Sequence, residues 1–95
     1  MTRDEERLRE IGPTIPTSEI PAVVVEACGL LCPLPLVKTA RALGALSNGS
    51  ILELRADDPA TIVDVPEWCA ERNHVYLGAA REGRLLRFFL RKGAG

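Results

Sequence analysis

Alternating apolar and polar residues in the second half of the chain predict β-strands. Residues 51–56 alternate strictly, with apolar side chains at every second position and Glu53 and Arg55 between them. Because successive side chains of a strand point to opposite faces, this pattern is typical of a strand with one buried face. We therefore expect Glu53 and Arg55 to lie on the solvent side of a sheet.

Two more strand-like runs follow at residues 75–81 and 84–91. Residues 82–83 between them have the composition of a two-residue hairpin turn. In the last run, Arg87 and Arg91 alternate with apolar residues, so we expect both arginines on the solvent face of the same sheet. The chain is therefore expected to end in an antiparallel hairpin.

The remaining segments predict one buried strand and two helices. Residues 22–27 form a mostly apolar run rich in valine, which favours a buried strand. Residues 33–46 place apolar side chains on one helical face and predict the first helix. The second helix is expected to begin at Asp58 and Pro59, a cap residue and a proline at the first helical position, and to kink or restart at Pro66.

This order of elements predicts a two-layer α/β (α+β) sandwich with the topology βαβαββ. A right-handed crossover favours parallel pairing of the first two strands, so the four-stranded sheet is expected to be mixed, with both helices on one face. Residues 22–95 form the predicted domain. Residues 1–21 are densely charged and then punctuated by proline, and we interpret them as a flexible N-terminal extension.

Composition excludes several classes of protein. The chain has 95 residues, 46% of them hydrophobic, and 12 basic against 13 acidic residues give a net charge of −1. There is no bulk positive field of the kind that attracts nucleic acid or anionic membranes. No apolar run approaches the ~18 residues of a membrane span, and the charged start lacks the apolar centre of a secretory signal. A cytoplasmic protein is expected.

Cysteine usage points to thiol or metal chemistry. Cys28, Cys32 and Cys69 are an odd number of cysteines in a chain with no secretory signal, so a disulfide framework is disfavoured. Cys69 falls on the apolar side of the second predicted helix, where we expect a packed core residue. Cys28 and Cys32 lie between the first strand and the first helix.

Cys32 is the candidate reactive residue. Pro33 and Pro35 are tolerated in a first helical turn, so the helix is expected to begin directly after Cys32. The helix macrodipole and free first-turn amides would then lower the pKa of this thiol from its usual ~8.5, leaving a thiolate that attacks sulfur without a separate base. The competing interpretation is a small apolar residue buried at a strand–helix junction.

Three segments carry a resemblance to a known family. They are residues 29–35 (GLLCPLP), 56–61 (ADDPAT) and 64–69 (DVPEWC). In order and spacing they resemble the TusA (SirA-like) sulfurtransferase family, over about residues 23–92. The resemblance implies the same βαβαββ sandwich.

The resemblance also implies a function. Cys32 would carry sulfur as a covalent persulfide, with Gly29, Pro33 and Pro35 forming the helix-start motif that supports the thiolate, and no cofactor would be needed. Sulfur would come from a donor protein such as a cysteine desulfurase or a rhodanese and pass to an acceptor protein. The chain would act as a sulfurtransferase or only as a carrier between enzymes, in tRNA 2-thiolation, sulfur oxidation or cofactor biosynthesis.

Other residues near the motif have open roles. Cys28 stands where the family more often has an apolar residue, and is either a packed substitute or a resolving thiol that attacks a persulfide on Cys32. Asp57 and Asp58 are a turn and helix cap whose acidic loop is also a candidate for partner docking. Arg87 and Arg91 are further candidates for partner docking on the outer sheet face.

Two other classes of function compete with sulfur transfer. Cys28, Cys32, Cys69 and His74 satisfy the loose spacing of a structural zinc site. The late basic residues suggest nucleic-acid binding, but aromatic residues for base stacking are few, so we expect no direct nucleic-acid contact and no membrane contact. That basic group consists of Arg81, Arg84, Arg87, Arg91 and Lys92.

Overall fold

The computed structural model describes residues 20–93 and confirms the predicted order of elements. The elements are β1 (Val23–Glu26), α2 (Leu34–Gly44), β2 (Ile51–Ala56), α3 (Thr61–Glu71), β3 (Val75–Glu82) and β4 (Leu85–Arg91). Within this part of the chain, no helix is both long and apolar enough to cross a membrane. The extension predicted over residues 1–21 lies outside the described residues, apart from its last two.

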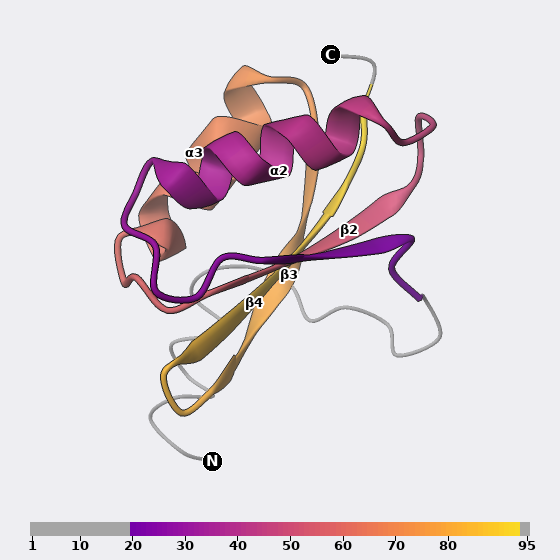
Figure 1. Ribbon diagram of the computed structural model, residues 1–95. Coiled ribbons are helices and arrows are strands. Elements are labelled where there is room, and N and C mark those ends of the chain that lie inside the picture. Colours follow the sequence, from indigo (N-terminus) through magenta and orange to yellow (C-terminus); the bar gives the residue numbers. More distant parts are fainter. Residues whose placement is uncertain (1–19, 94–95) are drawn as a thin grey trace.

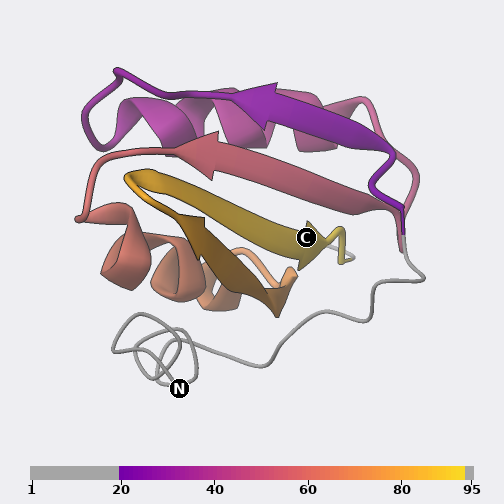
Figure 2. The ribbon, with the colours of Figure 1, turned by 90° about the horizontal axis from the view of Figure 1, so that it is seen from below.

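The sheet is mixed and is covered by helices on one face. Its strand order is β1-β2-β4-β3, with β1 parallel to β2 and the other neighbouring pairs antiparallel. Figure 1 shows α2 and α3 together on one side of the sheet, and Figure 2 shows β1 and β3 at its two edges. The predicted two-layer sandwich is therefore confirmed.

The core lies between the sheet and the helices. It contains Val25, Ala27, Leu43, Leu52, Leu54, Ala56, Val65, Cys69, Ala79, Leu86, Phe88 and Leu90. The alternating apolar positions of β2 and β4 supply most of the strand side, as their period of two requires. Cys69 is 1% exposed, so its prediction as a core residue is confirmed.

The second helix starts later than predicted and does not restart at Pro66. α3 is one continuous helix with Pro66 inside it, because the ring removes a single amide donor while Val65 and neighbouring turns bury one face of the helix. Asp58 caps the turn that precedes α3. Its carboxylate accepts a hydrogen bond from the Ala60 amide at 3.1 Å, and its carbonyl oxygen accepts one from the Thr61 amide at 3.0 Å.

The hairpin turn lies one residue later than predicted. Glu82 pairs with Leu85, so Gly83 and Arg84 form the turn. Gly83 has a φ of +61°, in the left-handed region that such a tight hairpin turn requires and that glycine adopts without strain.

The outer sheet face corrects the prediction for Glu53, which is 5% exposed rather than in solvent. Its carboxylate accepts two hydrogen bonds from Arg87, at 3.1 and 3.0 Å, and forms an ion pair with Arg55 at 3.3 Å. Arg87 also donates to Glu82 at 3.0 Å and lies over the Phe89 ring. These long neighbours bury Glu53, which the alternation of residue types does not reveal.

This arrangement generates a stability prediction. Arg87→Ala removes both hydrogen bonds to Glu53 and leaves a carboxylate that is hardly exposed. Breaking such a pair costs about 2 kcal/mol of unfolding free energy here, less than for a fully buried pair, because Arg87 remains partly in solvent. Urea denaturation measures the loss. Arg84→Ala, in the exposed hairpin turn, is the matched control and should change stability by less than about 0.5 kcal/mol; equal losses in both variants would refute the role of Arg87.

Candidate functional site

Two neighbouring carboxylates hold the loop that presents Cys32. Asp57 accepts a hydrogen bond from the Gly29 amide, and Asp58 accepts one from the Cys32 amide, both at 2.9 Å. Gly29 has a φ of +85°, which favours glycine at that turn. The loop after β1 and the loop after β2 are thus hydrogen-bonded to each other, which places Asp57 and Asp58 beside the Cys32 loop.

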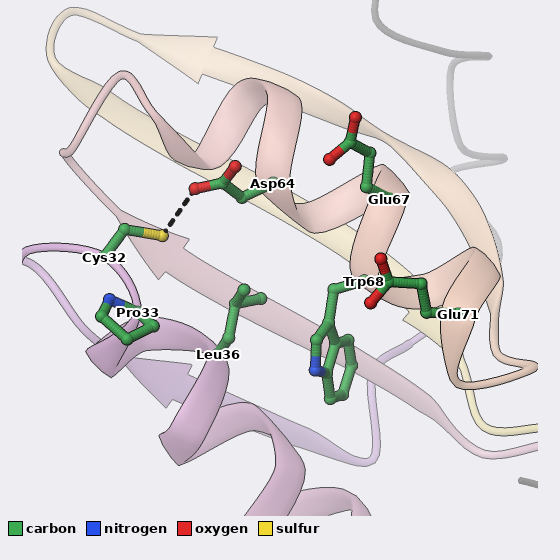
Figure 3. A pocket seen from close by; sticks show the side chains of 7 residues that line it. All are labelled: Cys32, Pro33, Leu36, Asp64, Glu67, Trp68 and Glu71. Carbon is green, nitrogen blue, oxygen red and sulfur yellow. Dashed lines mark hydrogen bonds between the residues drawn. The ribbon is translucent and has the colours of Figure 1, made fainter.

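Asp64 is a candidate site residue that the sequence analysis did not single out. The Cys32 thiol donates a hydrogen bond to its carboxylate, with 2.9 Å between Sγ and Oδ2 (Figure 3). Asp64 lies in the first turn of α3, in the third of the family-like segments. That motif position was the available signal, but only the fold shows that α3 carries it to the start of α2.

The predicted thiolate is wrong for the free protein. The pKa of the Cys32 thiol is raised to about 11 by burial, then by the hydrogen bond to Asp64, and further by the negative charges of Asp64 and Asp58. At neutral pH the side chain is therefore a protonated thiol that donates to a carboxylate.

The hydrogen bonding at the start of α2 explains the error. Pro33 and Pro35 have no amide hydrogen, and the amides of Leu34 and Leu36 are already bonded to the carbonyls of Leu31 and Pro33, at 2.9 and 3.0 Å. The amide of Cys32 itself is bonded to Asp58, as described above. The amides of this turn are therefore not free to stabilise a thiolate. The Cys32 thiol has carboxylates as neighbours, whereas the prediction assumed free amide donors.

Cys32 lies at one end of a groove between α2 and α3. The groove has a volume of about 380 Å³ and is lined by Cys32, Pro33, Leu36, Asp64, Glu67, Trp68 and Glu71. Figure 3 shows the Trp68 indole projecting across the space between the two helices. His74 stacks on Trp68 with 5.4 Å between ring centroids, and Arg72 lies 5.9 Å from the indole centroid. These contacts fix the indole as an apolar wall of the groove.

Cys28 is not a packed residue. Its side chain is exposed and its thiol is free, so the interpretation as an apolar substitute in the core is wrong. A resolving role for Cys28 stays a prediction.

The zinc site is also wrong. Within residues 20–93, no group of three or more His, Cys, Asp and Glu side chains is placed to hold a metal ion. Cys69 is buried in the core while Cys28 is exposed. His74 stacks on Trp68, and its Nδ1 accepts a hydrogen bond from the Gly93 amide at 3.0 Å.

The basic residues near the C-terminus have individual partners. Arg87 is committed to Glu53 and Glu82, and Lys92 donates to the Leu46 carbonyl. Arg81 and Arg84 line a separate cavity of about 490 Å³. Docking roles for Arg87 and Arg91 stay predictions, and most of the charge of Arg87 is already compensated.

The fold and site together define a small two-layer α/β domain with a partly exposed thiol at one end of a groove between its two helices. A SirA-like protein of Desulfitobacterium hafniense has the same fold, with a TM-score of 0.62 and 18% identity over 75% of this chain and 97% of that chain. A family model described as "Sulfurtransferase TusA" matches residues 23–92. The chain belongs to the TusA family, whose members include sulfur carriers.

Two relatives from Bacillus subtilis strain 168 bear the names "Putative sulfur carrier protein YrkF" and "Putative sulfur carrier protein YrkI". YrkF is 44% identical over 71 residues, which cover 75% of this chain and 38% of YrkF. YrkI is 39% identical over 70 residues, which cover 74% of this chain and 93% of YrkI. The chain therefore spans well under half of YrkF but nearly all of YrkI.

The geometry predicts how Asp64 affects Cys32. Asp64→Asn removes a negative charge beside the thiol, so the pKa of Cys32 should fall from about 11 while burial keeps it above the usual ~8.5. A lower pKa means more thiolate at a given pH. Alkylation by iodoacetamide at pH 8, in a Cys28→Ser background, should become roughly tenfold faster.

Glu67→Gln is the matched control for that measurement. Glu67 lines the same groove but is not among the charges that raise the pKa of Cys32. The alkylation rate of this variant at pH 8 should stay at the wild-type value. Equal increases in rate in the two variants would show that general surface charge, rather than the hydrogen bond to Asp64, sets the protonation of the Cys32 thiol.

Proposed function

We propose that Cys32 carries a sulfane sulfur as a persulfide, accepting it from a donor protein and passing it to an acceptor protein. One observation carries the proposal: the Cys32 thiol is partly exposed at the end of a groove and donates a hydrogen bond to the Asp64 carboxylate. Membership of the TusA family supports it. Cys28 and Cys69 lack this combination of access and a carboxylate partner in the described hydrogen bonds.

Loading begins with loss of the thiol proton. Asp64 is 2.9 Å from the sulfur and accepts the hydrogen bond of the thiol, and the proton passes to water before Cys32 attacks the outer sulfur of the donor's persulfide. A new S–S bond joins that sulfur to Cys32, the donor's S–S bond breaks, and the donor leaves as a thiolate. Because the free thiol is protonated, loading requires the loss of this proton, a step that the sequence-based mechanism did not include.

Delivery reverses these steps. A thiolate of the acceptor attacks the outer sulfur of the Cys32 persulfide, and Cys32 leaves as a thiolate that regains its proton. The outer sulfur extends about 2 Å beyond Sγ, so it stands in or beside the groove, where an acceptor can reach it. No oxidant, reductant or cofactor is consumed, since one sulfur atom moves between thiols.

The donor is a protein such as a cysteine desulfurase or a rhodanese, and the acceptor belongs to tRNA 2-thiolation, sulfur oxidation or cofactor biosynthesis. In this proposal the chain acts in the cytoplasm as a sulfurtransferase in the limited sense that it relays one sulfur per cycle. Its specificity then depends on which two proteins can bring a sulfur to the Cys32 end of the groove.

Intact mass measures the central claim. After incubation with a persulfide-loaded cysteine desulfurase, the wild-type protein should gain about 32 Da, and reduction should remove the gain. Cys32→Ser should gain nothing. A persistent gain in Cys32→Ser would place the carried sulfur on another cysteine and refute the proposal.

Cys28→Ser is the matched control, because it removes an exposed thiol only four residues away. The carrier role of Cys32 requires that this variant still gains one sulfur. Slower delivery or a lost intramolecular disulfide in Cys28→Ser would support a resolving role for Cys28, and unchanged transfer kinetics would refute that role.

A further inference from the structure

The groove beside Cys32 is strongly acidic along one helix. Asp64, Glu67 and Glu71 line it from successive turns of α3 (Figure 3). None of the three forms an ion pair with another residue of the described chain. The carboxylates of the outer sheet face, by contrast, are paired with arginines. Among residues 20–93, no ion pair compensates the negative charge of this groove, which lies directly beside the candidate carrier thiol.

The spacing of these carboxylates suits an extended cationic partner better than a metal ion. They recur at intervals of three and four residues, which places them along one stripe of a helix. Within residues 20–93, these carboxylates do not form part of any group of three or more His, Cys, Asp or Glu side chains that could bind a metal ion. Their charge is spread from the Cys32 end of the groove toward Trp68.

Exposed apolar side chains surround the same end of the molecule. Leu31 is 72% exposed and adjoins Cys32, and Val63 is 61% exposed and adjoins Asp64. Leu34 and Val37, in the first turns of α2, are also exposed. Exposed large apolar side chains are typical of surfaces that bind another protein, and these four are close in sequence to the groove residues Cys32, Leu36 and Asp64. This observation is independent of the acidic groove and points to the same region.

We propose that the groove between α2 and α3 docks a lysine- or arginine-containing segment of the sulfur donor, next to that protein's reactive cysteine. The donor is the partner because Cys32 is the attacking group only when it accepts sulfur. The inference rests on the proposed function, because it assigns the chemistry of the partner at the same site. Opposite charges steer the partner's sulfur toward Cys32 and disfavour proteins with acidic segments there. The apolar residues around Cys32 supply contact area beside the charges.

Docking also changes the state of the thiol. Two of the causes that raise the pKa of Cys32 are the negative charges of Asp64 and Asp58. A cationic side chain placed beside Asp64 compensates part of that charge, so the thiol loses its proton more readily in the complex than in the free protein. Partner recognition and thiol activation thus both involve Asp64.

Thiol–disulfide exchange with charged peptides tests the docking. Three five-residue probes carry a central cysteine blocked as a 2-pyridyl disulfide, flanked on both sides by arginine, glutamine or glutamate. Cys32 attacks the peptide sulfur and forms a mixed disulfide, while pyridine-2-thione leaves with the electron pair and a proton. The full chain is used in a Cys28→Ser background, and absorbance of the released thione gives the rate.

The arginine peptide should react roughly fivefold faster than the glutamine peptide, and the glutamate peptide more slowly, as expected for one or two exposed ion pairs. High salt should remove the difference. Glu67→Gln/Glu71→Gln should reduce the preference for arginine, with the glutamine peptide as internal reference. The matched control, Glu26→Gln/Glu82→Gln, removes the same charge from exposed ion pairs outside the groove and should retain it.

Equal rates for the three peptides, or an equal loss of preference in the groove and control variants, would overturn the docking proposal. The exchange needs no persulfide donor, so its outcome is separate from the mass measurement above. A protein that gains sulfur on Cys32 but shows no charge preference refutes the docking alone. A protein that shows the preference but never gains sulfur refutes the carrier function on which the proposal rests.

Discussion

The site depends on two hydrogen bonds that join the loops after two neighbouring strands, β1 and β2. The carboxylates of Asp57 and Asp58, which follow β2, accept hydrogen bonds from the amides of Gly29 and Cys32, which follow β1. Because β1 and β2 are parallel neighbours, both strands deliver their loops to the same edge of the sheet. The carboxylates then fix the turn before α2, and with it the direction of the Cys32 side chain toward α3. These two hydrogen bonds thereby hold the Cys32 thiol within hydrogen-bonding distance of Asp64 on α3.

Much of the fold follows from residue patterns that act locally. Strict alternation in β2 and β4 identified the buried faces, and the valine-rich run identified β1, because a period of two leaves few other structures open. The side chain of Glu53 escaped this reasoning. Glu53 is buried by Arg87, which lies on the neighbouring strand β4, and by Arg55, which is two residues further along β2. Pattern alone describes which face a residue occupies, not how its long neighbours cover it.

The candidate site shows the same division. Cys32 was identified because its position before two prolines and its family-like motif are written in consecutive residues. The state of its thiol was predicted wrongly, since a helix start normally offers free amides and this one has none to spare. Asp64 comes from 32 residues away in sequence, and its contact with Cys32 depends on tertiary packing. The consecutive motif therefore identified the candidate reactive atom, while tertiary contacts determine its protonation.

The protonated thiol has a consequence for durability. Peroxides oxidise thiolates far faster than thiols, and repeated oxidation of a cysteine ends in acids that cannot be reduced again. Cys32 is partly exposed, yet its pKa of about 11 leaves it almost entirely in the slowly oxidised form at neutral pH. The carboxylates that raise the pKa of Cys32 therefore also slow its oxidation. Between encounters with other proteins, this accessible sulfur is protected from irreversible chemical damage.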